Sequence, residues 1–203
     1  MTMKSNAFNF RREIKTYIEE SIEPKREILA KYLDVINDVT NEIIEAYRND
    51  KKVIWFGNGG SAADAQHLAC ELVSKFYMER KALPSIALTT NTSTLTAISN
   101  DFCYEKVFER QVEAFAKEGD VLIGITTSGK SVNVINALKT AKTKGAITVA
   151  FTGNSTDKIR ACVDYLIPVP SNNTPHIQES HIMIGHIICY LVEKALFGDM
   201  HGK

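Results

Sequence analysis

The chain has 203 residues, of which 44% are hydrophobic and 24% charged, a composition typical of a globular protein. Its 24 basic and 24 acidic residues balance, so it lacks the basic excess of a nucleic-acid-binding domain. We see no secretory signal and no apolar run near the ~20 residues of a membrane span, which predicts a cytoplasmic protein without a membrane partner. The four cysteines form no CxxC pair, which excludes a disulfide framework and a cysteine zinc site.

The first 50 residues differ from the rest because their apolar side chains recur at helical spacing. Pro24 lies between two such stretches. Because proline cannot continue a helix interior, we predict two amphipathic helices at about 8–22 and 25–49. We interpret residues 1–50 as helices for oligomer packing and residues 51–203 as the domain that carries the function, the two forming one structural unit.

Beyond residue 50, short apolar runs alternate with helical patterns, which predicts an α/β protein whose parallel sheet has helices on both faces. Five strands favour the flavodoxin-like order 2-1-3-4-5, with the first 50 residues as an N-terminal helical extension. A last helix, at about 176–197, is apolar nearly all round, which favours burial and subunit packing. The predicted strands are Val53–Phe56, Ser85–Leu88, Val121–Ile125, Ile147–Phe151 and Tyr165–Ile167, separated by helices at about 61–76, 104–117, 131–143 and 155–161.

Two similar loops follow the first and third predicted strands. One contains Gly57-Asn58-Gly59-Gly60, and the other reads Thr126-Thr127-Ser128-Gly129-Lys130-Ser131. Each precedes a helix, whose N-terminus stabilises phosphate. In the order 2-1-3-4-5 the two strands are neighbours at the switch point, so both loops are predicted to face one ligand-binding crevice. The alternative is that the glycines only make tight turns and the hydroxyls only cap helices.

Each loop also matches a nucleotide-binding motif. Residues 57–62 fit the dinucleotide fingerprint, but the second strand leads into Thr89-Thr90-Asn91, without the acidic residue that binds the ribose. Residues 124–131 match the Walker A pattern, but none of the other four predicted strands ends in an acidic residue that would organise Mg²⁺. A P-loop NTPase that depends on Lys130 stays an alternative.

The helix after the first loop carries three titratable side chains on one face. Asp64, His67 and Glu71 are spaced i, i+3 and i+7, so His67 and Glu71 can reach one metal ion or one substrate. The alternatives are structural: Asp64 stabilises the helix dipole, His67 is a partly buried histidine, and Glu71 pairs with Lys75.

Two further polar segments are candidates for binding. The segment Thr89–Asp101 is rich in Thr, Ser and Asn and is predicted as a loop that binds a polyhydroxy ligand, or as a capped turn. The last helix carries four polar groups in an apolar context, where unpaired groups are costly, and this favours a site over core histidines. These four are Gln178, Glu179, His181 and His186.

In this order, the motifs resemble the SIS-domain phosphoheptose isomerases over about residues 10–197. The resemblance is carried by the segments 57–72, 100–101, 119–134 and 177–181. It implies conversion of sedoheptulose 7-phosphate to D-glycero-D-manno-heptose 7-phosphate through an enediolate, the first step of ADP-heptose synthesis for lipopolysaccharide or capsule. Other branches of the family are non-catalytic modules that bind a sugar phosphate or a replication-initiator protein. This chain keeps Glu71 and His186, which favours the enzyme.

The resemblance also implies a set of site residues. Glu71 and His186 are the implied catalytic pair, and one zinc ion per subunit is held by His67, Glu71, Gln178 and His186. It further implies a homotetramer with active sites between subunits. The implied substrate contacts are Asn58, Gly59, Gly60, Glu71, Asn100, Asp101, Thr126, Thr127, Ser128, Ser131 and Gln178.

Two observations qualify this assignment. Spacing alone favours His181 as a ligand, because it lies three residues after Gln178 whereas His186 lies eight after it. The choice of His186 therefore rests on the resemblance. Lys75 and Pro175-His176 stand where some relatives have Arg and Asp-Arg, and Lys cannot reproduce a bidentate Arg.

Overall fold

The computed structural model describes residues 8–198. A five-stranded parallel sheet forms the centre of the molecule. The strand order is β2-β1-β3-β4-β5, so the predicted order and all five predicted strands are confirmed. Gly57 at the end of β1 pairs with Ile125 near the end of β3, which places the two polar loops side by side. The strands are β1 Val53–Gly57, β2 Ser85–Ala87, β3 Val121–Thr126, β4 Ile147–Thr152 and β5 Tyr165–Pro168.

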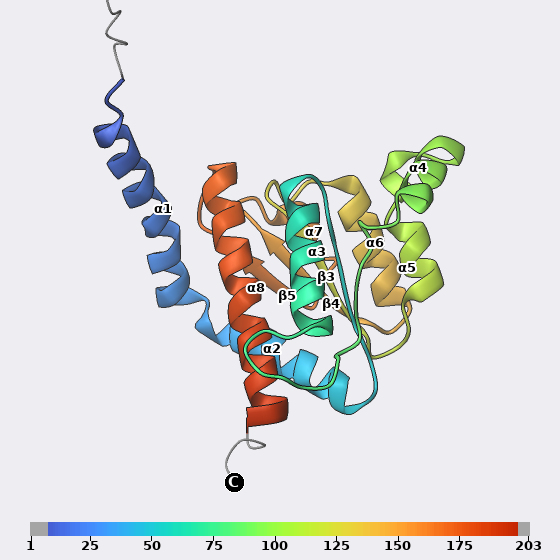
Figure 1. Cartoon of the computed structure of the whole chain (residues 1–203). Coiled ribbons are helices and arrows are strands. Elements are labelled where there is room, and N and C mark those ends of the chain that lie inside the picture. The colour runs from blue at the N-terminus through green and yellow to red at the C-terminus, as the bar shows by residue number, and fades with distance from the viewer. Residues whose placement is uncertain (1–7, 199–203) are drawn as a thin grey trace, which may run out of the picture.

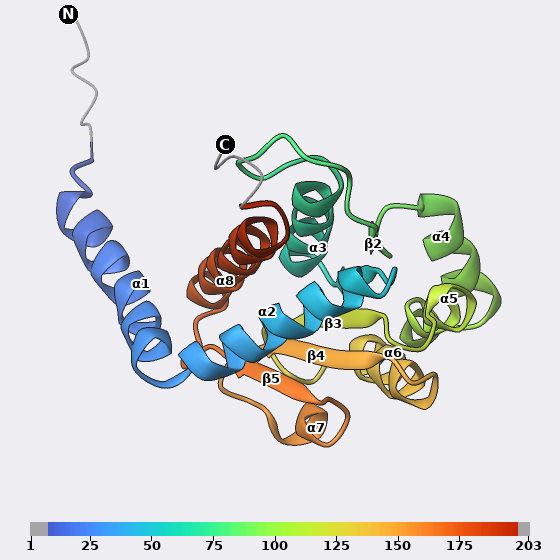
Figure 2. The same cartoon turned by 90° about the horizontal axis from the view of Figure 1, so that it is seen from below.

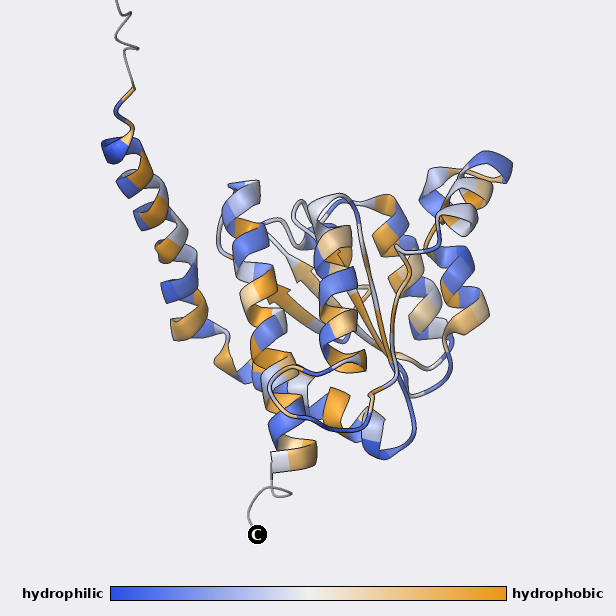
Figure 3. Ribbon diagram, in the orientation of Figure 1, coloured by the Kyte–Doolittle hydropathy of each residue, from blue (hydrophilic) through white to orange (hydrophobic). Residues whose placement is uncertain are grey.

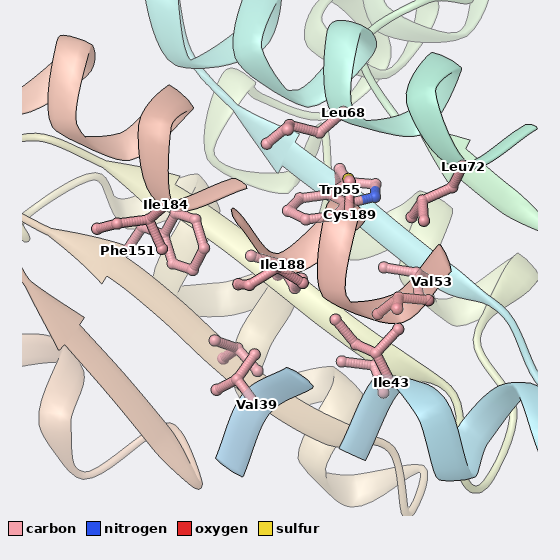
Figure 4. Close-up of a cluster of buried hydrophobic side chains, with 14 of the residues drawn as sticks. Val39, Ile43, Val53, Trp55, Leu68, Leu72, Phe151, Ile184, Ile188 and Cys189 are labelled. Atoms are coloured by element: carbon pink, nitrogen blue, oxygen red, sulfur yellow. The ribbon is translucent and has the colours of Figure 1, made fainter. Parts of the chain in front are cut away.

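Helices cover both faces of the sheet (Figures 1 and 2). One face packs against α2 (Leu33–Arg48), α3 (Gly60–Val73) and α8 (Thr174–Phe197), and Figure 4 shows Trp55, Leu68 and Ile188 meeting in this core. Side chains on the other face pack against three of the other helices. These are α5 (Glu109–Phe115), α6 (Val132–Thr143) and α7 (Asp157–Arg160).

The last helix, α8, is long and apolar enough to cross a membrane by length and composition alone, although the sequence predicts no membrane span. Half of its most apolar stretch is buried, and it packs against α2 and α3. Gly185 lets α3 approach closely, because a Cβ at this position would collide with Leu68. The apolar character of α8 is therefore that of a core helix of the domain.

The N-terminal helix, α1 (Arg11–Lys31), runs unbroken through Pro24, so the predicted break at this proline is wrong. An interior proline removes a single backbone hydrogen bond, and here the helix continues around a buried Pro24. The chain instead turns at Tyr32, where α1 ends against α8 and α2 starts across the sheet. Residues 1–7 and 199–203, at the ends of the two predicted segments, lie outside the described residues.

The polar segment after β2 is a helix, α4 (Thr92–Asp101), where the sequence predicts a loop. Asn91 provides the N-cap, because its side chain accepts a hydrogen bond from the Thr94 N–H at 3.0 Å. The helix buries no residue, so the hydrophobic periodicity that reveals other helices is missing here. The next predicted helix, 104–117, divides into a short 3₁₀ turn, Tyr104–Lys106, and α5.

Candidate active site

The two predicted loops meet through a reciprocal amide pair. Asn58 donates to Asn133 Oδ1 at 3.0 Å, and Asn133 donates back to Asn58 Oδ1 at 2.9 Å. The hydroxyl of Tyr104 donates to the same Asn58 oxygen at 2.8 Å. Tyr104 is absent from the sequence-based candidates, because no motif surrounds it. The pair fixes the loop after β1 to the first turn of α6, as the switch-point argument predicts.

The hydroxyl-rich loop between β3 and α6 gathers side-chain hydroxyls at the start of a helix. The hydroxyls of Thr126 and Ser131 lie 2.9 Å apart, and Ser128 accepts the Lys130 N–H at 3.2 Å. Ser131 is the N-cap of α6, but its side chain makes no capping hydrogen bond. Of the first N–H groups of α6, that of Val134 donates to Asn133 Oδ1 at 2.9 Å, whereas no hydrogen bond among residues 8–198 uses those of Val132 and Asn133. These two groups can reach a ligand, and the positive helix end favours an anion.

The structure argues against the P-loop interpretation of this segment. Gly124, the first glycine of the Walker-like pattern, lies inside β3 and not in a phosphate-binding loop. A Cβ there would lie 2.8 Å from Val134 Cγ1, so this glycine permits the packing of α6 on the sheet. Lys130 is exposed at the end of the loop.

The glycine loop after β1 positions α3 and contacts α8. Gly59 has φ +57°, a backbone conformation that side chains rarely adopt, and forms the N-cap of α3. Gly60 lies against Gln178, since a Cβ there would collide with the Gln178 amide. The structure thus places Gln178 beside Gly60, the first residue of α3, at the end of that helix next to the glycine loop.

Three of the predicted metal or catalytic side chains converge further along α3. His67 Nε2 lies 3.2 Å from Glu71 Oε1 and 2.9 Å from His186 Nε2. The two rings meet edge to face. Figure 1 shows how this arises, because α3 and α8 lie side by side across the face of the sheet.

The convergence has an electrostatic cost that a cation would offset. Burial and the neighbouring His67 lower the pKa of His186, although Glu71 opposes them. Asp64, one turn earlier on α3, has a buried oxygen without a hydrogen-bond partner, and burial raises its pKa to about 6. Two imidazoles and one carboxylate, with donor atoms all within 4.8 Å of one another, form a group that can hold a metal ion.

His181, which spacing favoured, lies elsewhere. Its ring is fully buried, and Nε2 lies 3.0 Å from the carbonyl oxygen of Thr152 at the end of β4. Burial lowers its pKa to about 4, so the ring is neutral at physiological pH. His181 is a core residue, whereas His186 reaches the group on α3.

Two predicted substrate contacts lie apart from the other site residues within the chain. Asn100 and Asp101 occupy the last turn of α4, and the Asn100 amide donates to Asp101 at 2.9 Å. Both are exposed. Figures 1 and 2 show α4 at the edge of the molecule farthest from α1. Among residues 8–198, no hydrogen bond connects either side chain to the loops or to the group on α3.

Comparison with known proteins places this fold and site in a family. The SIS domain family matches residues 16–153. The chain therefore belongs to the SIS-domain family.

Within this family the relatives are named isomerases. The chain is 54% identical to the phosphoheptose isomerase of Clostridium acetobutylicum, over 92% of this chain and 96% of that protein. It is 55% identical to the phosphoheptose isomerase of Aneurinibacillus thermoaerophilus, over 91% and 94%. The solved phosphoheptose isomerase of Neisseria gonorrhoeae superposes with a TM-score of 0.86 at 39% identity, over 91% of this chain and 99% of that chain. The chain is accordingly an isomerase of the phosphoheptose isomerase group.

Proposed function

We propose that this enzyme interconverts sedoheptulose 7-phosphate and D-glycero-D-manno-heptose 7-phosphate through an enediolate. The observation that carries the residue assignment is the convergence of His67, Glu71 and His186 along α3, the helix that begins at the anion-binding loops. His67 lies seven residues after Gly60, or about 10 Å along the helix axis. An extended seven-carbon sugar phosphate fits this separation, with its phosphate at the loops and its carbonyl end at the histidines.

The phosphate is bound by the β3–α6 loop in this proposal. Thr126, Thr127, Ser128 and Ser131 supply hydroxyls, and the start of α6 supplies backbone N–H groups. Asn58, Gly59 and Gly60 contact the sugar from the neighbouring loop, and the Gln178 amide faces the same region. Binding through hydroxyls and N–H groups holds the substrate while its other end reacts.

The proton transfers are assigned to two side chains. The Glu71 carboxylate takes a proton from one carbon and returns it to the neighbouring carbon, and the His186 imidazole moves protons between the two sugar oxygens. Glu71 Oε1 faces His67, which leaves Oε2 for the carbon proton. Burial and the neighbouring His67 lower the pKa of His186, which favours the neutral ring, the form that can accept a proton.

We propose one zinc ion per subunit, held by His67, Glu71 and His186, with Gln178 as the fourth ligand by resemblance. Two imidazole nitrogens and a carboxylate oxygen are ligands that zinc prefers. Bound zinc supplies positive charge for the oxyanion that develops on the substrate. The Gln178 amide lies against Gly60, so to bind the same ion as His67 and His186 its side chain must leave Gly60 and extend along α8.

We also propose a homotetramer with active sites between subunits, in which residues 1–50 serve the packing. Support comes from α1, which extends away from the sheet and carries hydrophobic residues, coloured orange in Figure 3. Several of their side chains are exposed. Asn100 and Asp101 then contact substrate from the edge of α4 within the assembly. The exposed apolar residues of α1 and its N-terminal flank are Phe8, Phe10, Ile14, Tyr17, Ile18, Ile22 and Leu29.

The proposed setting is the cytoplasm, in the synthesis of ADP-heptose for lipopolysaccharide or capsule. The four cysteines are all unpaired, which agrees with a reducing compartment. Cys70 is exposed and free.

Incubation with sedoheptulose 7-phosphate, followed by NMR of the sugar protons, tests the reaction. We expect the aldose product to form, and solvent deuterium to enter the carbon next to the carbonyl. Binding of the substrate without any product would instead support a non-catalytic SIS module, the alternative that other branches of the family represent.

The zinc proposal is tested by stripping the enzyme with a chelator, verifying metal loss by elemental analysis, and adding zinc back. We expect activity to disappear and to return with one equivalent of zinc per subunit. Full activity of verified metal-free enzyme would contradict a role for zinc. Light scattering coupled to size-exclusion chromatography measures the number of subunits, and a monomer or dimer would contradict the tetramer.

A further inference from the structure

A buried ion pair fixes the segment after α3 to helix α8. Arg80 Nε lies 3.1 Å from Glu193 Oε1, and their side chains are only 1% and 2% exposed. Neither residue belongs to a motif in the sequence, and neither has a part in the proposed reaction. Both members of the pair also make hydrogen bonds to the backbone next to the proposed catalytic side chains.

Glu193 binds the backbone of the segment that follows α3. Its carboxylate accepts hydrogen bonds from the N–H groups of Phe76, Tyr77 and Met78 at 3.0, 2.7 and 3.0 Å. Burial alone raises the pKa of Glu193, but these donors together with Arg80 outweigh it and leave the pKa below its usual value. Glu193 is therefore ionised at neutral pH and holds three successive backbone groups.

Arg80 closes the C-terminal end of α3. Its Nη2 donates to the carbonyl oxygen of Glu71 at 2.9 Å, and its Nη1 donates to those of Leu72 and Ser74 at 2.8 and 3.0 Å. The last carbonyls of a helix have no partner within the helix, and this end frays unless they are capped. Arg80 thus holds the backbone of the residue to which we assign the carbon proton.

The same segment touches the other proposed catalytic side chain. The ring of Phe76 packs on the ring of His186, with centroids 5.6 Å apart and planes inclined by 42°. The N–H of Phe76 is one of the groups that Glu193 binds. One ion pair is therefore connected by direct contacts to the Glu71 backbone on α3 and, through Phe76, to the His186 ring on α8.

We propose that Arg80 and Glu193 are positioning residues that set Glu71 and His186 at their working separation. The proposal rests on the proposed function, because it assumes that these two side chains act together. Neither positioning residue needs to touch the substrate. Side chains that act together must be held within a fraction of an ångström, and here they come from helices far apart in the sequence.

The chain offers a matched control at the other end of the sheet. The buried carboxylate of Asp120 also accepts backbone N–H groups, from Lys52 at 3.1 Å and Lys117 at 2.8 Å, and it also pairs with a cation, the Lys52 amine. Asp120 immediately precedes β3, whereas the anion-binding loops follow the strands. Loss of its charge costs stability in the same way but at a distance from the site.

The experiment compares Glu193→Gln with Asp120→Asn. We measure kcat and KM separately, zinc affinity by competition with a chromophoric chelator, and melting temperature. We expect Glu193→Gln to lower kcat and zinc affinity by about 10–100-fold while KM stays near the wild-type value, because the phosphate loops are untouched. Asp120→Asn is expected to lower the melting temperature but to leave kcat and zinc affinity unchanged.

Arg80→Lys provides a second variant in case Glu193→Gln does not fold. Lysine keeps the charge beside Glu193 but cannot bind several carbonyls at once, so we expect a similar loss of kcat and zinc affinity. Wild-type values of both in either folded variant would overturn the proposal. An equal loss in Asp120→Asn would overturn it too, because the effect would then be general destabilisation.

An NMR measurement on metal-free protein separates this proposal from the proposed function. The Phe76 ring shifts the ring-proton resonances of His186, and we expect both variants at the ion pair to change this shift while Asp120→Asn leaves it unchanged. If the wild-type enzyme neither bound zinc nor turned over substrate, the proposed function would fail. An unchanged His186 shift in both ion-pair variants would instead refute the positioning role alone.

Discussion

The two ends of the candidate site are built in different ways. The proposed anion-binding end consists of short continuous segments that follow neighbouring strands, joined by the Asn58–Asn133 pair. The chemical end consists of single side chains on α3 and α8, and its histidines are 119 residues apart in the sequence. The first end follows from the sheet topology, whereas the second depends on how two helices pack. We expect changes at the first to affect binding and changes at the second to affect turnover.

The largest effect is expected from Glu71→Gln. The amide keeps the size of the side chain but cannot take a proton from carbon, so kcat should fall by about a thousandfold or more while substrate still binds. Steady-state kinetics measure kcat, and titration calorimetry measures binding. Glu79→Gln is the control, since Glu79 is an exposed carboxylate after the same helix. Near-normal turnover of Glu71→Gln would remove this residue from the mechanism.

His181 tests whether His181 and His186, both on α8, differ as the structure indicates. Burial lowers its pKa to about 4 from 6.5, so the unfolded chain takes up a proton before the folded one does as the pH falls. The free energy of unfolding should therefore decrease between pH 6.5 and 4, by up to about 3 kcal/mol from this residue. Urea unfolding at several pH values measures it. In His181→Gln this part of the pH dependence should vanish, and a slope equal to that of wild type would contradict the assignment.

Ser131→Ala probes the anion-binding end. Loss of a hydroxyl that binds a charged phosphate costs about 1.5–3 kcal/mol, so KM should rise by about tenfold or more with little change in kcat. Thr143→Ala, at the opposite end of α6, should leave both parameters unchanged. A fall in kcat at constant KM would show that the two ends of the site are less separate than we infer.

The smallest effect is expected from Lys130→Ala. This lysine completes the Walker-like pattern, but its side chain is exposed, and it is its backbone N–H that donates a hydrogen bond to the Ser128 hydroxyl. The kcat and KM of isomerisation should stay near the wild-type values. We expect neither the wild-type enzyme nor the variant to hydrolyse ATP. Phosphate-release assays with ATP and Mg²⁺ check the second point, and hydrolysis that requires Lys130 would revive the NTPase alternative.

Sequence reasoning worked best where hydrophobic periodicity was strong. Short apolar runs that alternate with helical patterns predict all five strands, and a parallel sheet of five strands favours the order that the structure shows. It failed at α4, whose polar residues bury no side chain, and at Pro24, where one missing hydrogen bond did not end the helix. It also missed Tyr104 and the Arg80–Glu193 pair, because their partners are distant in the sequence.

The sequence by itself determined the sheet and the two loops at its switch point, because short-range patterns encode strands, turns and helix starts. It left open which histidine of the last helix approaches His67. Only the tertiary structure decided this, since the packing of α8 on α3 and the sheet turns His181 toward the end of β4 and His186 toward His67. Side chains five residues apart on one helix differ in direction, and the neighbours that a helix packs against assign each direction its role.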